Sequence, residues 1–413
     1  MTTTGVTEAT APHAARWRAL FWLALTSLLG MSTWFSGTAV IGPLREAWAL
    51  TPAQGSWLTI AVQLGFVTGA LIAALTNLVD LVPPHRLLVS SLTLAATANS
   101  LFSLAHGPGA GMPLRFLTGV FLAGVYPTAL KLMATWFRTD RGLALGIMVG
   151  SLTLGSAAPH LVRGLGGAFP WRQVVQVTSW LTAVAVVVGH LAVREGPYPF
   201  PRARFDPTQA GRVLRDRGVR LACIGYFGHM WELYAMWGWI AVFLGDVFGR
   251  RGIGGPQLAS AWAFAVIGAG FLGSWWAGAY SDRVGRPESA ALAMAVSGAC
   301  ALTIGLLAGN GPAWLLIAIA LVWGASVVAD SAQFSTMVTE MADPAYVGTA
   351  LTLQLAIGFT LTAATLWLVP VLREHGGWLA AFAMLAPGPI VGIVAMLALR
   401  APGKSLGSRG GRE

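Results

Sequence analysis

The sequence predicts an all-α membrane protein, and three properties of the chain support this fold class. Of the 413 residues, 55% are hydrophobic and only 10% are charged, whereas a soluble globular protein carries about 25% charged residues. The mean hydropathy is +0.67. The apolar residues form long unbroken runs, unlike the short alternating segments of a membrane β-barrel. These properties exclude a water-soluble enzyme, a fibrous protein and a disordered chain.

Twelve apolar stretches are long enough to cross a bilayer, whose core of about 30 Å needs about 20 apolar residues per helix. Charged or Gly/Pro-rich breaks separate them, and they lie near residues 17–42, 54–78, 86–105, 113–136, 142–162, 172–193, 219–245, 256–280, 288–308, 312–341, 344–371 and 377–399. We therefore expect twelve transmembrane helices. The tail 1–16 has no apolar core typical of a cleaved signal peptide, so we expect the first helix to be retained.

The basic residues predict the orientation of these helices. With an even number of spans, both termini lie on one side, and most of the 26 Lys and Arg fall on that side, seven of them in the segment 194–220. The positive-inside rule then places both termini in the cytoplasm. Because this asymmetry and contact with anionic lipid explain the net charge of +10, we expect no nucleic-acid partner.

The polar segment near residue 200 divides the chain into two similar parts. We expect a tail (1–16), an N-terminal six-helix half (17–193), a linker (194–218), a C-terminal six-helix half (219–399) and a second tail (400–413). A loop sequence recurs after the second span of each half, at Asn77 to Arg86 and at Gly278 to Arg286. The repeat predicts that the two halves are pseudo-symmetric.

The C-terminal copy, Gly278-x-x-Ser-Asp-Arg-x-Gly-Arg286, resembles the signature loop of the major facilitator superfamily. The N-terminal copy keeps Asp80 and Arg86 but lacks the first Arg and the Gly. Two further stretches resemble the same superfamily: Arg115-x-x-x-Gly-x-x-x-x-Gly124, and a ladder of glycines from Gly142 to Gly155 that ends at Pro159. The resemblance implies the major facilitator fold and a bacterial inner-membrane location.

The loop charges are candidates for gating. A carboxylate beside basic residues at the end of a helix can pair with a neighbouring helix and release it when the halves rock. The gating candidates are Asp282, Arg283 and Arg286, with Asp80 and Arg86 in the N-terminal copy. The alternative is that these are ordinary charges at the membrane surface.

Glu232 is the principal candidate for proton coupling, since it lies at the midpoint of the seventh span. An ionisable group inside a lipid-spanning helix is costly unless it faces a polar interior, so we expect Glu232 to line a central cavity. His229 precedes it by one turn on the same face, and Tyr226 lies one turn further back. The resemblance adds Arg115, near the outer face. The alternative for Glu232 is a structural carboxylate between helices.

Lys131 and Asp330 lie at similar depth in the corresponding fourth and tenth spans and carry opposite charges. One hypothesis is that they form a cytoplasmic contact between the halves in the outward-open state. A second is that Lys131 binds an anionic substrate, and a third is that it snorkels to the membrane surface.

Uncharged polar and aromatic residues in the spans complete the candidate binding site. Glutamine in hydrocarbon needs a partner, whereas many tryptophans belong to the interfacial belt. The substrate-binding candidates besides Lys131 are Trp34, Gln63, Tyr126, Trp237, Gln333 and Gln354.

These features predict a secondary transporter that works by alternating access, with protons as the coupling ion. The stretch from Gly124 to Phe137 resembles permeases near the nitrate/nitrite and organic-anion porters, which favours a small anionic substrate. The alternatives are a proton-driven exporter of hydrophobic or cationic compounds, and a membrane sensor without transport. No enzyme motif occurs, so we expect no catalysis, metal or cofactor. The expected partners are a small-molecule substrate, protons and lipid, and the expected state is a monomer.

Overall fold

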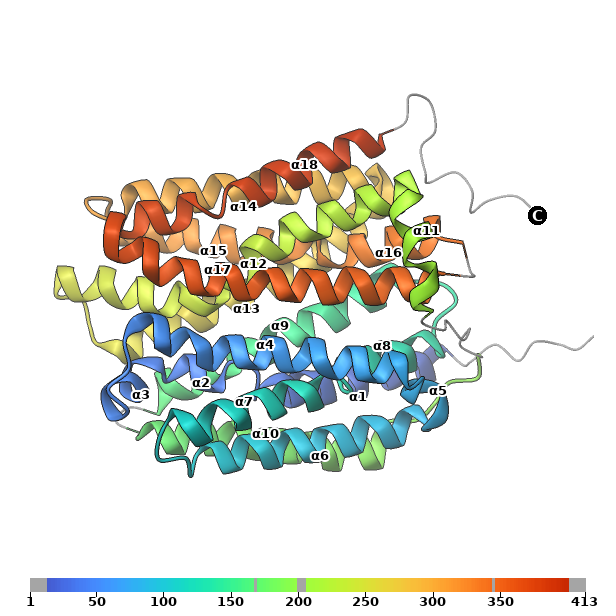
Figure 1. Ribbon diagram of the computed structural model, residues 1–413, viewed down its shortest axis with the longest axis horizontal. Helices are drawn as coiled ribbons and strands as arrows, with labels where there is room; N and C mark the ends of the chain where they lie inside the picture. The colour runs from blue at the N-terminus through green and yellow to red at the C-terminus, as the bar shows by residue number, and fades with distance from the viewer. Residues whose placement is uncertain (1–12, 167–168, 199–205, 344–345, 401–413) are drawn as a thin grey trace, which may run out of the picture.

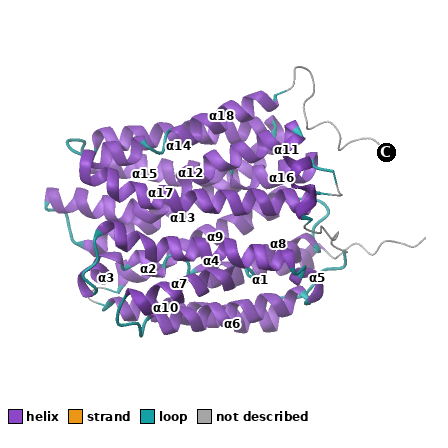
Figure 2. Ribbon diagram, in the orientation of Figure 1, coloured by secondary structure: helices purple, strands orange, loops and turns teal. Residues whose placement is uncertain are grey.

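Helices make up almost all of the described chain. The structure, a computed structural model, describes residues 13–166, 169–198, 206–343 and 346–400, and within these ranges it contains no strand (Figure 2). Each of the twelve stretches expected to span the membrane is helical over most of its described residues. The all-α prediction is therefore confirmed.

The first ten helices carry the six expected spans of the N-terminal part. They are α1 (His13–Met31), α2 (Ser36–Ala39), α3 (Ile41–Ala47), α4 (Pro52–Leu75), α5 (Leu78–Leu81), α6 (Pro84–Phe102), α7 (Pro108–Leu122), α8 (Tyr126–Ala134), α9 (Arg141–Leu165) and α10 (Trp171–Ala192).

The remaining helices carry the linker and the six expected spans that follow it. They are the 3-10 turn η1 (Pro207–Gln209), α11 (Ala210–Arg215), α12 (Arg217–Arg251), α13 (Pro256–Val284), α14 (Arg286–Leu307), α15 (Ala313–Ala329), α16 (Ser331–Met341), α17 (Val347–Ala383) and α18 (Pro387–Leu399).

Length and hydropathy identify membrane-crossing segments in this set. Within the described residues, eight helical segments are long and apolar enough to cross a bilayer, and the longest runs from Val347 to Leu399. That segment includes two of the expected spans. Its helix α17 is kinked between them, at Gly376 and Gly377. Gly377 has a φ of +65°, which glycine adopts without the steric cost of a side chain. The chain is thus a multi-pass membrane protein.

The helices form two layers (Figure 1). One layer contains α1 to α10, in blue to green, and the other contains α12 to α18, in yellow-green to red. Two long helix pairs join the layers, α9 with α13 and α4 with α17. The α9/α13 pair packs closely through glycines: a Cβ at Gly146 would lie 3.1 Å from the carbonyl oxygen of Ser274. Small residues are typical of such close helix contacts in membranes.

Besides the twelfth expected span, which is broken between Ala383 and Pro387, three expected spans are broken near the middle rather than continuous. The first is interrupted between Met31 and Ser36, the fourth between Leu122 and Tyr126, and the tenth at Asp330. Helix breaks leave backbone groups without helical partners, and in a membrane such groups are tolerated only where protein or a cavity surrounds them. The breaks in the first, fourth and tenth spans lie next to the site described below.

We name the two ends of the helix bundle by what they carry. The linker end holds α11, the start of α1 and the last described residue, Arg400, and it is on the right in Figure 1. The far end holds α3 and is on the left. At the linker end, Asp216 begins α12 by accepting a hydrogen bond from the backbone N–H of Val219 at 3.0 Å, a standard N-cap contact.

Candidate functional site

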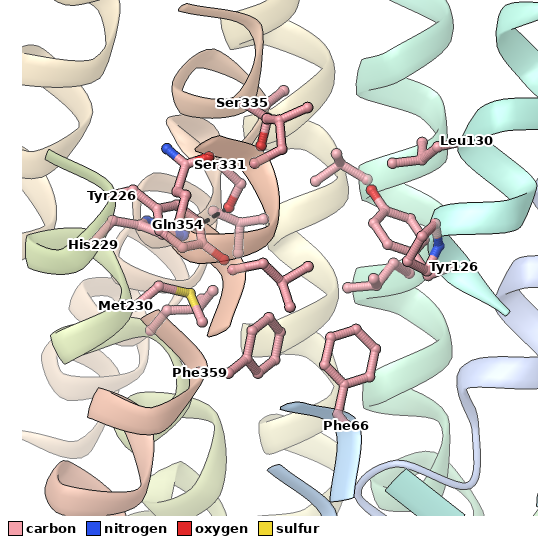
Figure 3. Close-up of a pocket in the computed structure, with 18 of the residues that line it drawn as sticks. Phe66, Tyr126, Leu130, Tyr226, His229, Met230, Ser331, Ser335, Gln354 and Phe359 are labelled. Carbon is pink, nitrogen blue, oxygen red and sulfur yellow. Dashed lines mark hydrogen bonds between the residues drawn. The ribbon is translucent and has the colours of Figure 1, made fainter. Parts of the chain in front are cut away.

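A cavity of about 480 Å³ lies between the two layers. Helices α8 and α9 form one wall, and α12, α16 and α17 form the other. Figure 3 shows Tyr126 and Leu130 on one side, with Tyr226, His229 and Gln354 facing them. Most of the lining side chains are aliphatic or aromatic, and the polar ones are few. This composition is typical of a site for a small organic molecule.

Aromatic rings close the cavity toward the far end. Phe66 of α4 and Phe359 of α17 meet across the two layers with ring centroids 4.6 Å apart (Figure 3). Trp34, at the break in the first span, contacts Tyr234 at 5.9 Å and Phe359 at 5.8 Å. All four side chains are at most 7% exposed. We call Trp34, Phe66, Tyr234 and Phe359 the aromatic floor.

The cavity is accessible from the linker end. Ser335 of α16, in its wall, is exposed to solvent, and Tyr126, Lys131 and Tyr226 are partly exposed. Because the aromatic floor is buried while these residues are not, the structure has a single-sided access that faces the linker end.

Five of the predicted substrate-binding residues line this cavity. They are Trp34, Tyr126, Lys131, Trp237 and Gln354. Lys131 is the only lysine or arginine among the described lining residues, and no aspartate or glutamate is among them. The indole N–H groups of Trp34 and Trp237 and the amide nitrogen of Gln354 are buried without a hydrogen-bond acceptor. These three nitrogens are covered by protein in this conformation and have no acceptor among the described residues. Lys131 therefore carries the one positive charge of the described cavity lining.

His229, predicted as a proton-coupling residue, also lines the cavity. Its Nδ1 lies 2.8 Å from Oδ1 of Asp330, and both side chains are 2% exposed. Its Nε2 lies 2.9 Å from Oγ of Ser331, the first residue of α16. Asp330 lies at the helix break and belongs to the same layer as His229. The structure thus pairs Asp330 with His229. Our hypothesis of a contact between Lys131 and Asp330 concerns the outward-open state and stays a prediction.

Glu232 does not line the cavity, so the expectation that it faces the central passage is wrong. It is 1% exposed and points into the α12–α18 layer. Ser297 of α14 donates a hydrogen bond to its Oε2 at 2.8 Å, and the indole N–H of Trp323 donates to its Oε1 at 2.7 Å. The one-turn spacing from His229 does place both residues on neighbouring faces of α12, but a helix 35 residues long buries one face against its own layer.

Arg115 is not interfacial but completely buried in α7. Its guanidinium donates to the carbonyl oxygen of Thr33 and to Ser36 Oγ, both at 3.0 Å, and to the carbonyl of Trp34. It also donates to Oδ1 of Asn99 at 3.0 Å. Arg115 therefore satisfies the carbonyls that the break between α1 and α2 leaves free, and so positions Trp34 in the aromatic floor.

Two predicted binding residues lie outside the cavity lining. Gln63 of α4 is completely buried, and its side-chain amide has no hydrogen-bond partner among the described residues. Gln333 of α16 accepts a hydrogen bond from Arg286 at 3.2 Å. The prediction failed for both because polarity within a span does not indicate which way the helix faces.

The gating candidates separate into two groups. Asp282 lies against the start of α9, because a Cβ at Gly142 would be 3.1 Å from its Oδ2. Arg286 of α14 pairs with Glu340 of α16 at 2.9 Å, a contact between neighbouring helices. Arg283 and Arg86 are exposed. The side chain of Asp80 lies outside the described residues.

Sequence reasoning missed several residues that shape the cavity. Phe66, Tyr234 and Phe359 form most of the floor, yet each is one of many aromatic residues in the spans. Ser331 and Ser335 are small and common. The position of Ser331 beside an intramembrane aspartate was the one signal in the sequence that could have identified it.

The fold and cavity define a multi-pass membrane protein with an internal binding chamber that is reached from one side. A family model for the Major Facilitator Superfamily matches residues 20–364, and the chain belongs to this superfamily. The recognition made from the loop motifs is confirmed.

Curated relatives match only part of their own length. A 3-(3-hydroxy-phenyl)propionate transporter of Escherichia coli is 28% identical over 268 residues, which cover 61% of each chain. A probable sulfoacetate transporter of Cupriavidus necator is 24% identical over 60% of each chain. An MFS-type transporter of Aspergillus terreus is 24% identical over 41% of this chain and 56% of its own. The chain thus matches about three fifths of the length of these relatives.

Proposed function

We propose that this protein is a secondary transporter of a small organic anion, a carboxylate or sulfonate attached to an apolar or aromatic body. The observation that carries the proposal is the described cavity lining, which combines aromatic and aliphatic walls with one lysine and no carboxylate. An anionic head group would accept a charge-assisted hydrogen bond from the ammonium of Lys131. A volume of about 480 Å³ is sufficient for one aromatic ring with a short acidic side chain.

The named functions of two relatives support this class of substrate. The names of the bacterial relatives refer to hydroxyphenylpropionate and to sulfoacetate, which are both organic anions. The first also carries an aromatic ring, the component for which the aromatic floor is suited by ring stacking.

Transport would proceed by alternating access. In this proposal the linker end faces the cytoplasm of a bacterium, so the structure corresponds to an inward-facing state closed by the aromatic floor. The two layers rock about the α9/α13 and α4/α17 contacts, and the floor opens as the linker end closes. We further propose that the proton gradient drives the cycle.

The alternative, an exporter of cationic compounds, has less support. A cationic substrate needs an accessible carboxylate, whereas Glu232 and Asp330 are buried behind the cavity wall and Lys131 lies within it. Hydrophobic neutral compounds remain an alternative that the aromatic floor would accept.

The proposal is tested by uptake into proteoliposomes under an imposed pH gradient. The panel contains 3-(3-hydroxyphenyl)propionate, benzoate, sulfoacetate, the amide analogue of the first compound and the cation tetraphenylphosphonium. We expect accumulation of at least one anion and of neither the amide nor the cation. Transport of the cation alone would overturn the proposal.

Lys131 provides the matched test within the chain. Lys131→Gln removes a charge from the cavity, Lys131→Arg keeps it, and Arg18→Gln removes an exposed charge of α1 away from the cavity. We expect Lys131→Gln to weaken anion binding at least tenfold, which is about 1.4 kcal/mol, while Lys131→Arg loses less and Arg18→Gln binds as the native protein. Equal loss in Lys131→Gln and Arg18→Gln would show that the cavity lysine has no specific role.

A further inference from the structure

His229 connects a buried carboxylate to a hydroxyl group in the cavity wall. The carboxylate is that of Asp330, 2.8 Å from Nδ1, and the hydroxyl is that of Ser331, 2.9 Å from Nε2. His229 and Ser331 line the cavity, whereas Asp330 is not among the described lining residues. Figure 3 shows His229, Ser331 and Gln354 together on one wall. The three groups form a line from the interior of the α12–α18 layer to the substrate chamber.

We propose that the His229–Asp330 pair carries the coupled proton and that Ser331 transmits its protonation state to the anionic group of the substrate. This inference rests on the proposed function, since it names the coupling site of the same cavity. It also replaces Glu232, to which the sequence analysis assigned the proton.

The hydrogen-bonding capacity of the three groups gives the mechanism. Nδ1 of His229 lies at ion-pair distance from Asp330. In the neutral tautomer that carries its proton on Nδ1, the lone pair of Nε2 accepts the hydroxyl proton of Ser331. Ser331 then presents only lone pairs to the cavity, which repel a carboxylate. When a proton binds to Nε2, both ring nitrogens donate and Ser331 becomes the acceptor. Its own O–H is released to donate to a substrate oxygen.

Protonation of His229 also changes the charge of the cavity wall in a way that favours binding of an anion. Protonation of His229 adds one positive charge to the cavity wall, whatever the other groups contribute, and Asp330 stabilises the imidazolium. The other ionisable groups in the described cavity lining are the phenols of Tyr226 and Tyr234 on α12, the phenol of Tyr126 and the ammonium of Lys131. Glu232 lies one turn along α12 but outside the lining. Glu232 is held by Ser297 and Trp323 on the opposite side of the wall. Proton and anion therefore bind together, as symport requires.

Two measurements on the reconstituted protein distinguish proton coupling from substrate transport itself. With 3-(3-hydroxyphenyl)propionate as the probe, two rates are measured: exchange across proteoliposomes at equal pH, and accumulation driven by a pH gradient. We expect His229→Gln and Asp330→Asn to reduce gradient-driven accumulation at least tenfold more than they reduce exchange. Glu232→Gln, the control, keeps both. The inference is overturned if His229→Gln accumulates the probe as the native protein does, or if Glu232→Gln exchanges but no longer accumulates it.

Binding in detergent gives an independent readout. Because the protonated form binds the anion better, the affinity of the native protein should rise as the pH falls, by up to about tenfold per pH unit. In His229→Gln the affinity should be independent of pH and equal to the native value at high pH, which also shows that the variant folds. An unchanged slope in His229→Gln would contradict the inference.

Ser331 distinguishes a relay from a purely electrostatic effect. Ser331→Thr keeps the hydroxyl, so we expect the native pH dependence. Ser331→Ala should reduce affinity at low pH and leave it unchanged at high pH. If Ser331→Ala has the anion affinity of the native protein at every pH, Ser331 does not transmit the protonation state of His229 to the substrate. Failure of the native protein to bind any anion of the panel would overturn the proposed function itself, an outcome distinct from all of these.

Discussion

Glu232 and Trp323 form a hydrogen bond inside the α12–α18 layer, in which the indole N–H donates to Oε1 at 2.7 Å. With the bond from Ser297 at 2.8 Å, this carboxylate ties α12 to α14 and α15. A buried charged or polar group is tolerated when its hydrogen bonds are satisfied. Glu232, the acidic residue at the midpoint of the seventh span, therefore holds three helices of one layer together.

Substitutions of Glu232 should therefore affect stability according to the hydrogen bonds they keep. Glu232→Gln retains an acceptor for Trp323 and a partner for Ser297, so we expect the free energy of unfolding to change by about 1 kcal/mol or less. Glu232→Leu leaves both donors without acceptors, at a cost of about 1–3 kcal/mol for each buried group. Thermal unfolding of the purified protein in detergent measures the difference. Equal loss in both variants would contradict this structural role.

Arg115 should be required for the shape of the aromatic floor. Arg115→Gln cannot reach the carbonyls of Thr33 and Trp34 together with Asn99, and each acceptor left buried costs about 1–3 kcal/mol. We expect a marked loss of thermal stability and of anion binding. Arg163→Gln, which removes an arginine that donates to the carbonyl of Phe169 at the end of α9, is the matched control. A native-like Arg115→Gln would show that the broken first span does not need its donor.

The α9/α13 contact offers a test of alternating access at its two ends. A Cβ at Gly142, at the linker end, would lie 3.1 Å from Asp282 Oδ2, and a Cβ at Gly164, at the far end, would lie 3.0 Å from the backbone nitrogen of Ala261. Gly164→Val should separate the helices at the far end and favour opening there, whereas Gly142→Val should favour the conformation in this structure.

Cysteine labelling from the far end reports the outcome. Ser56 of α4 is 3% exposed and borders a small pocket between the layers with Trp239 and Leu366. In a background with Cys223 and Cys300 replaced, Ser56→Cys should react with an impermeant maleimide several times faster in Gly164→Val than in Gly142→Val. Faster labelling in Gly142→Val than in Gly164→Val would contradict the prediction that a valine side chain separates α9 and α13 at its own end.

The Phe66–Phe359 contact should hold the floor closed. Aromatic pairs contribute about 0.5–1.5 kcal/mol beyond their buried area, so Phe359→Ala should shift the conformational equilibrium by up to about tenfold toward far-end opening. The same Ser56→Cys labelling measures it, with Phe21→Ala, a substitution of an exposed aromatic residue on α1, as control. Unchanged labelling in Phe359→Ala would show that the ring contact does not gate the cavity.

The sequence predicted some residues of the cavity lining correctly and others wrongly. Lys131, His229, Tyr126 and Gln354 were identified correctly as cavity residues, because polar groups in lipid-spanning helices seek a polar interior. The same argument wrongly predicted that Glu232 and Gln333 line the cavity. Both side chains instead form hydrogen bonds with residues of their own layer, and such bonds also satisfy a buried polar group. The partnership of Asp330 with His229 arises where the tenth span breaks, and no pattern in the sequence predicted that break.

The sequence by itself determined that the chain is helical, where its helices lie and to which superfamily it belongs, because backbone hydrogen bonding in lipid leaves few alternatives to a helix and because the loop motifs are specific. Only the tertiary structure decided which face of each helix meets the cavity. The reason is physical: lipid and protein interior are both apolar, so hydropathy does not determine the rotation of a helix about its axis, and packing against neighbouring helices does.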